Sequence, residues 1–176
     1  MIKQKFSART LSLTGALLLS VGAATSTDAA TQTANLAVTA SVTANCSIST
    51  APVAFGAYDP LVTNAATPLN GTGTVSVTCT NGASTTVTLG QGSNAGGGST
   101  DAAPARRMGD GASHFLTYSL YSNTGRTTVW GNTAGTGQAS TGTGSLVALT
   151  VYGAVDAGQN VPAGSYSDTV VATVTF

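Results

Sequence analysis

Cys46, Cys79 and His114 are the side chains of this chain best suited to covalent or metal chemistry, and they are all of its cysteine and histidine. Zinc sites use about four ligands, so these three residues are too few to predict one. A general base or a catalytic triad would have to use His114, yet no nearby serine stands in a nucleophile-elbow pattern such as GxSxG. The aspartates fall mainly in predicted turns or at predicted strand starts, where Asp caps backbone donors. We therefore expect no enzyme activity, no cofactor and no metal site.

One glycine motif matches a cofactor-binding pattern. Gly90, Gly92 and Ala95 follow a predicted strand and fit the dinucleotide pattern GxGxxA. That mechanism needs a helix whose N-terminus holds the pyrophosphate, and here further glycines follow at 96–98. The motif therefore predicts a flexible loop.

Asp168 is a charge in an apolar setting, because it shares one strand face with Tyr166 and Val170. A charge at such a position must be paired or lie at the rim of the core. Arginines at 106, 107 and 126 are the cations available outside the first 29 residues. We expect Asp168 to form a structural bridge with one of them in preference to a catalytic pair.

Aromatic side chains could form a sugar-binding platform, the candidates being Phe115, Tyr118, Tyr121, Trp130 and Tyr152. Leu116, Tyr118 and Leu120 share one face of a predicted strand, which favours core packing for most of the set. Trp130, beside Gly131 at the end of its strand, stays open between the two interpretations.

The N-terminal 29 residues are predicted to be a secretory signal peptide. A basic head with Lys3, Lys5 and Arg9 precedes an apolar stretch at 11–24 and then small residues as far as Ala30. Cleavage is expected between Ala24 and Ala30. The remainder would have three Arg against five Asp, a net charge near −2, which gives no basic surface for nucleic acid.

Export also bears on the two cysteines, because the secretory route leads to an oxidising compartment where an isolated pair normally closes. We therefore predict a disulfide between Cys46 and Cys79.

The rest of the chain, about 147 residues, predicts one all-β domain. Short apolar segments between Gly, Asn and Pro are typical of a β-sandwich; the predicted strands are 35–48, 52–56, 73–80, 85–89, 115–122, 126–130, 145–152 and 165–176. Gly-rich segments at 90–113 and 131–144 interrupt this rhythm, and either ordered or poorly ordered loops fit them. Residues 105–108 could form an extra edge strand.

The two ends of this domain have complementary patterns. Tyr166, Val170, Ala172, Val174 and Phe176 fall on one face of the last predicted strand, and no later segment follows to pair with its edge. An unpaired apolar edge is an aggregation hazard that proteins cover. Leu36, Val38, Ala40 and Val42 share one face of the first predicted strand and could provide that cover. The pattern predicts subunits that complete one another.

Several motifs together resemble the spore coat protein U domain family, whose members include subunits of Csu-type archaic chaperone-usher pili. They are the Cys46 segment, the Phe55-Gly56 turn, VSVTCT at 75–80, LTYSLYSN at 116–123, Trp130-Gly131, VYGAV at 151–155 and GSYSDTVVATVTF at 164–176. The resemblance covers nearly all of residues 34–176 and keeps the family's order of motifs.

The resemblance implies an immunoglobulin-like sandwich that lacks its final strand. A periplasmic chaperone would fill the groove first, and the N-terminal extension of the next subunit would then replace it at an outer-membrane usher. The expected organisation is a signal peptide at 1–29, a donor-strand extension at 30–44 and a pilin-type domain at 45–176. The implied function is a homopolymeric surface fibre for adhesion and biofilm formation. A non-polymerising coat or matrix protein of the same fold and a small outer-membrane β-barrel are the alternatives.

Overall fold

The computed structural model describes residues 28–176, so the predicted signal peptide lies outside the described residues except for its last two. Residues up to Ala40 and residues from Ser41 onward form separate units. From residue 28 to Asn45 the chain has no regular secondary structure and is exposed throughout. The described part of the chain contains no helix long and apolar enough to cross a membrane.

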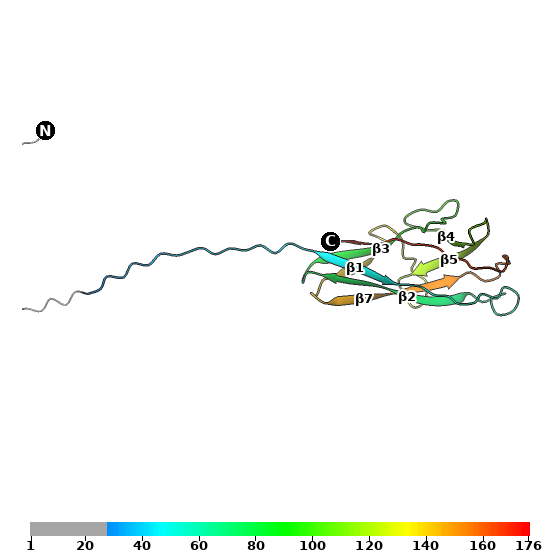
Figure 1. Ribbon diagram of the computed structural model, residues 1–176, viewed down its shortest axis with the longest axis horizontal. Coiled ribbons are helices and arrows are strands. Elements are labelled where there is room, and N and C mark those ends of the chain that lie inside the picture. Colours follow the sequence, from blue (N-terminus) through cyan, green and yellow to red (C-terminus); the bar gives the residue numbers. More distant parts are fainter. Residues whose placement is uncertain (1–27) are drawn as a thin grey trace, which may run out of the picture. The chain divides into compact units, whose positions relative to one another are not determined.

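The domain is a sandwich of two antiparallel sheets (Figure 1). The larger sheet has the order β1-β2-β7-β5-β4, with β1 Cys46–Ala51, β2 Leu69–Cys79, β7 Leu146–Val155, β5 Phe115–Tyr121 and β4 Arg106–Gly109. The smaller sheet has the order β6-β3-β8, with β6 Gln138–Thr141, β3 Ser84–Leu89 and β8 Ala172–Thr175. The all-β fold predicted from the sequence is therefore present.

The core lies between the two sheets because the strands alternate apolar side chains with small polar ones. Its buried apolar residues are Val75, Val77, Cys79, Val87, Leu89, Leu116, Tyr118, Leu120, Trp130, Val151, Ala154 and Val155. Trp130 is completely buried, and its Nε1 donates a hydrogen bond to the Val87 carbonyl at 2.8 Å. Trp130 is therefore a core residue, and its ring is not available for a sugar platform.

Two predicted strands are wrong: one forms at a different position and the other does not form. The strand predicted at 35–48 forms instead at Cys46–Ala51, where the disulfide and the β2 ladder hold the chain. Pro52–Gly56 is not a strand, although Val53 and Phe55 alternate as in one. A Cβ on Gly153 would come within 2.7 Å of the Phe55 ring, so this segment packs across the inner face of the sheet over glycines.

The remaining differences concern the edges of the fold. Residues 126–130 form only an isolated bridge between Tyr121 and Val129, because Arg126 takes a left-handed turn conformation with φ 52°. The extra edge strand considered at 105–108 is present as β4, and the second Gly-rich segment contains β6. The last predicted strand, 165–176, pairs as a regular ladder only over β8.

Candidate functional site

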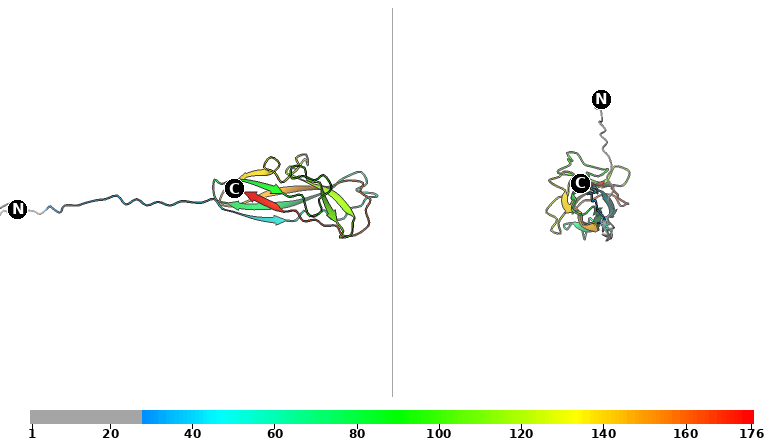
Figure 2. Two further views of the ribbon diagram at one scale, coloured as in Figure 1. Left: turned by 90° about the horizontal axis from the view of Figure 1, so that it is seen from above. Right: turned by 90° about the vertical axis from the view of Figure 1, so that its left-hand side faces the viewer.

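β1 and β8 are edge strands of different sheets that face each other across one side of the sandwich. Each is last in its sheet and pairs on one side only, β1 with β2 and β8 with β3. The two strands also contact each other, and Figure 2 shows β8 (red) beside β1 (cyan). Both therefore present unpaired edges on the same side of the domain.

The side chains that point inward from these two edges are only partly covered. Residues opposite each other in a ladder share a face, so Ile48 points inward with its partner Val77. Val77 is 2% exposed, whereas Ile48 is 37% exposed. Across the gap, Val174 lies opposite the fully buried Val87 and is itself only half-buried. Away from the points where the two strands contact each other, the core is open between β1 and β8.

A groove lies next to Ile48 and Val174 and continues away from them. One cavity of about 390 Å³ lies between the 50–55 segment and the 166–172 segment, over a floor that includes Val75, Leu89, Leu120 and Val151. A second cavity of about 540 Å³ continues toward Leu69, Leu116 and Val161. The two share Val53, Phe55, Met108 and Tyr166 as lining. The groove is therefore lined mainly by apolar residues.

The segment predicted as the acceptor edge forms one wall of the groove. Tyr166, Val170 and Ala172 line it, Val174 continues the same face, and Phe176 is 55% exposed. The backbone of Ser167 pairs with Gly109, the Thr169 carbonyl accepts from Ser93 and the Val171 carbonyl accepts from Gly90. Since strand backbone groups alternate in direction, the residues between these point their N–H and C=O groups to the open side.

Asp168 also belongs to this wall, and its carboxylate is held by neutral donors. The Tyr118 hydroxyl donates to Oδ2 at 2.7 Å, and Oδ1 accepts the backbone N–H groups of Ser93 at 2.9 Å, Asn94 at 3.2 Å and Thr169 at 2.9 Å. Burial of Tyr118, and then its hydrogen bond to Asp168, raises the pKa of its hydroxyl far above the ordinary value. The expected bridge between Asp168 and an arginine is wrong: within residues 28–176 no arginine lies within ion-pair distance of a carboxylate, and the close contact of this type joins Asp110 to His114.

Arg106 instead holds the chain where β3 leaves the sheet. It is 1% exposed; its Nε donates to the Gly90 carbonyl, and its Nη2 donates to the carbonyls of Leu89 and Trp130, each at 2.8 Å. Burial lowers the pKa of this guanidinium. Its role is to satisfy backbone carbonyls that the end of β3 leaves unpaired.

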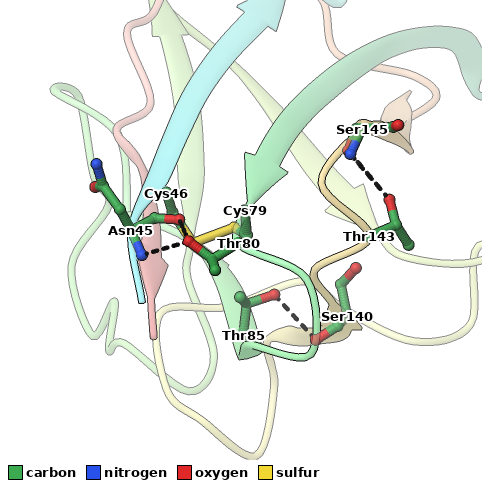
Figure 3. The surroundings of a disulfide bond; sticks show 8 residues. All are labelled: Asn45, Cys46, Cys79, Thr80, Thr85, Ser140, Thr143 and Ser145. Atoms are coloured by element: carbon green, nitrogen blue, oxygen red, sulfur yellow. Dashed lines mark hydrogen bonds between the residues drawn. A yellow bond between two sulfur atoms is a disulfide. The ribbon is translucent and has the colours of Figure 1, made fainter. Parts of the chain in front are cut away.

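The predicted disulfide is present at the start of β1. Cys46 and Cys79 are direct partners in the β1–β2 ladder and are covalently joined (Figure 3). Next to them, the backbone N–H of Asn45 donates to the Thr80 hydroxyl at 3.0 Å, and the Thr80 N–H donates to the Asn45 carbonyl at 2.9 Å. The chain is thus anchored to β2 from Asn45 onward.

The predicted donor residues precede this anchor. Leu36 is 88% exposed and Val38 and Val42 are each 85% exposed, and Ala40 is exposed as well. Leu36, Val38 and Val42 are thus three large, exposed apolar side chains at alternate positions of the segment, with the small Ala40 between the last two. Such an exposed apolar surface is typical of an interaction site.

The remaining sequence candidates have structural roles. His114 Nδ1 lies 2.6 Å from Asp110 Oδ2 in the turn between β4 and β5, and this hydrogen bond lowers the pKa of Asp110. Gly92, with φ 87°, passes so close to the Asp168 carboxylate that a Cβ would collide with it. The GxGxxA motif is therefore a loop built around a carboxylate. Within the described range, no three His, Cys, Asp or Glu residues gather as a metal site would require.

Sequence reasoning missed the part of the groove formed by Val53, Phe55 and Met108. The available signal was the row of glycines at 71, 73 and 153, which leaves space on the inner face of two strands for side chains from another segment. Phe55 fills that space and also packs edge-on against Tyr118, with ring centroids 6.1 Å apart.

Comparison with known proteins gives concordant results. Residues 32–173 match the model of the Spore Coat Protein U domain. Protein U of Myxococcus xanthus is 49% identical over 156 residues, which cover 85% of this chain and 87% of that protein. A chain in the crystal structure of the CsuC-CsuE chaperone-tip adhesion subunit pre-assembly complex, from archaic chaperone-usher Csu pili of Acinetobacter baumannii, superposes with a TM-score of 0.55 at 22% identity.

That superposition covers 77% of this chain but only 40% of the solved chain. At this identity the likeness concerns the fold, which is the immunoglobulin-like sandwich predicted from the sequence.

Proposed function

This chain belongs to the spore coat protein U domain family, and we propose that it is a non-enzymatic structural subunit of a bacterial surface fibre. In this proposal each subunit receives residues 30–44 of another copy as a strand between β1 and β8. The mode of recognition is β-strand addition, in which backbone hydrogen bonds supply affinity and side-chain pockets supply specificity.

The observation that carries the proposal is the open core between β1 and β8. Ile48 is 37% exposed opposite a Val77 that is 2% exposed, and the groove beside it is lined mainly by apolar residues. An added strand would cover Ile48 and pair with both free edges. Leu36, Val38 and Val42 supply the matching side chains, since all three are more than four-fifths exposed.

The energy available is enough for a durable joint. Burying Leu36, Val38 and Val42 at about 1.5–3 kcal/mol each would contribute roughly 5–9 kcal/mol. Each ladder hydrogen bond adds about 1 kcal/mol net. Because the groove of one subunit binds a different segment of the next, the contact is heterologous and open, and it generates a filament.

An open groove must be covered before assembly, because an exposed apolar edge promotes aggregation. We propose that the predicted signal peptide directs export, that a periplasmic chaperone covers the groove and that an outer-membrane usher exchanges the chaperone for the next subunit. The similar solved fold comes from a chaperone-subunit complex, which supports a chaperone partner. Adhesion and biofilm formation are the functions proposed for the fibre.

A coat or matrix protein of the same fold is the second candidate. The higher identity, 49%, is to Protein U, and the family description names a spore coat. Such a protein would use the sandwich in a surface layer without forming fibres. The two candidates differ in whether sheared cells release filaments.

The test compares two double variants of the full chain in its native cell, Leu36→Asp/Val38→Asp and Ala37→Asp/Thr39→Asp. The first puts charges on the face proposed to enter the groove, and the second puts the same charges on the opposite face. Sheared wild-type cells should release filaments that give a ladder on denaturing gels without heating. The first variant should lose both filaments and ladder, and the second should keep them. Filaments that survive in the first variant would refute the donor role of this segment.

A further inference from the structure

We propose that Asp168 sets the register of the incoming strand, which runs antiparallel to residues 166–172 and places Ala40 over the carboxylate. This inference rests on the proposed function, because it names which donor residue meets which groove position.

Asp168 is a fixed feature of the groove. Among the described residues that line the two cavities it alone carries a charge. Tyr118 and three backbone N–H groups bind its two oxygens. Gly92 leaves no room for the carboxylate to withdraw, because even a Cβ at that position would collide with it. A strand laid in the groove must therefore pass over a carboxylate that cannot move aside.

The first cavity decides which positions of the wall are compared with the donor segment. Four inward residues of the wall line this cavity, namely Tyr166, Asp168, Val170 and Ala172, and the intervening Ser167 and Thr169 also reach it. Val174 and Phe176 lie beyond its lining. The donor segment offers four alternate positions as well, namely Leu36, Val38, Ala40 and Val42. Side chains of directly paired residues share a face. If all four donor positions pair with these four wall positions, one antiparallel and one parallel arrangement are possible.

The antiparallel arrangement suits both the charge of Asp168 and the sizes of the paired side chains. Leu36 then lies beside the small Ala172, Val38 beside Val170 and Ala40 beside Asp168. A methyl group at this point leaves space for a water molecule that keeps the carboxylate solvated. In the parallel arrangement Val38 would cover Asp168, and removing water from a carboxylate without a new hydrogen-bond donor is costly. The small residue in an otherwise bulky stripe thus has a defined place.

Crosslinking through outward-facing residues tests the register while leaving Asp168 and the donor face intact. In the antiparallel arrangement residue 37 lies opposite residue 171, whose backbone carbonyl already bonds Gly90 and whose side chain is 66% exposed. Such non-hydrogen-bonded pairs bring the two Cα atoms to about 4.5 Å, which lies within the range that disulfides span.

Three full-length variants are compared in fibres: Ala37→Cys/Val171→Cys, Ala37→Cys/Ser167→Cys and Ala37→Cys/Thr173→Cys. The first should give intermolecular disulfides. The second would crosslink in the parallel arrangement and the third after a slip of two residues. Preferential crosslinking in the second or third variant overturns the proposed register. Loss of fibres in the Leu36→Asp/Val38→Asp test would instead refute the proposed function.

The role of the carboxylate is tested with Ala40→Leu, Ala37→Leu and Ala40→Leu/Asp168→Ala. Ala40→Leu should make heated fibres dissociate at least about tenfold faster than Ala37→Leu, a difference of about 1.4 kcal/mol. Removing the carboxylate in the double variant should restore much of the loss. Equal dissociation rates for Ala40→Leu and Ala37→Leu would overturn the proposal even if the double variant failed to fold.

Discussion

Ile48 lies directly opposite Val77 in the β1–β2 ladder, yet 37% of its surface is exposed whereas Val77 is 2% exposed. Both side chains point to the same inner face, so the difference arises from what lies above them. Val77 is covered by the opposing sheet, whereas Ile48 lies at the incompletely covered edge, next to the β1 residues Thr50 and Ala51 that line the groove. The proposed strand addition follows from this local asymmetry more directly than from any single motif.

Loss of the disulfide should destabilise the domain. Cys46 and Cys79 are 33 residues apart, and closing such a loop restricts the unfolded chain. Cys46→Ala/Cys79→Ala should lower the free energy of unfolding by about 2–5 kcal/mol. Urea unfolding is best measured in a form that carries a second copy of residues 34–44 after Phe176, which we expect to fill the groove. A change below about 0.5 kcal/mol, within the range of ordinary surface substitutions, would contradict this expectation.

The packing of Phe55 over glycines predicts that Gly153 tolerates no side chain. A Cβ there would lie 2.7 Å from the Phe55 ring and 2.8 Å from Val53. Gly153→Ala should therefore destabilise by about 1–3 kcal/mol through overpacking. Gly97→Ala is the matched control, because an added Cβ meets nothing within 4 Å. Equal unfolding midpoints for the two variants would show that the 53–55 segment is not seated on this glycine.

Tyr118 predicts a specific loss of stability at alkaline pH. Its folded-state pKa is raised by burial and by Asp168, whereas an unfolded tyrosine titrates near about 10. Above that pH the unfolded chain has released a proton that the folded chain keeps, so the free energy of unfolding falls as pH rises. The contribution is fully present below about pH 10.

Tyr118→Phe removes this group from the titration. From about pH 10 to about pH 11 the variant should show a shallower decline in unfolding free energy, by up to about 1.4 kcal/mol per pH unit. Denaturant unfolding at a series of pH values measures the slope. A slope unchanged from that of the wild-type chain would mean that Tyr118 titrates in the folded state as it does when unfolded.

Strands in which apolar and polar residues alternate strongly were predictable from the sequence, because turn residues mark both of their ends. The segments predicted at 85–89 and 115–122 correspond to β3 Ser84–Leu89 and β5 Phe115–Tyr121 within one residue at each end. Pro52–Gly56 has the same alternation but packs over the glycines of β2 and β7. Periodicity reports which side chains share a face, and it does not report whether the backbone finds a ladder partner.

The surroundings of Asp168 were not predictable for a related reason. An apolar setting indicates that a charge needs a partner, but several chemically different partners satisfy that need. The structure supplies a tyrosine hydroxyl and backbone N–H groups from a distant loop. Their approach depends on Gly92, whose role becomes apparent only when the loop and the last strand are placed together.

Self-complementation tests the central claim most directly. The chain without its predicted signal peptide is compared with the same chain carrying residues 34–44 on a flexible linker after Phe176, and with a third form in which Leu36 and Val38 of the added copy are Asp. The account predicts that only the second is a soluble monomer with a cooperative, high melting temperature, because an open core cannot offset chain entropy and a buried unpaired charge cannot close it. If the chain without the added copy is monomeric and melts as cooperatively and at as high a temperature as the second form, the sandwich is already complete and strand addition is wrong.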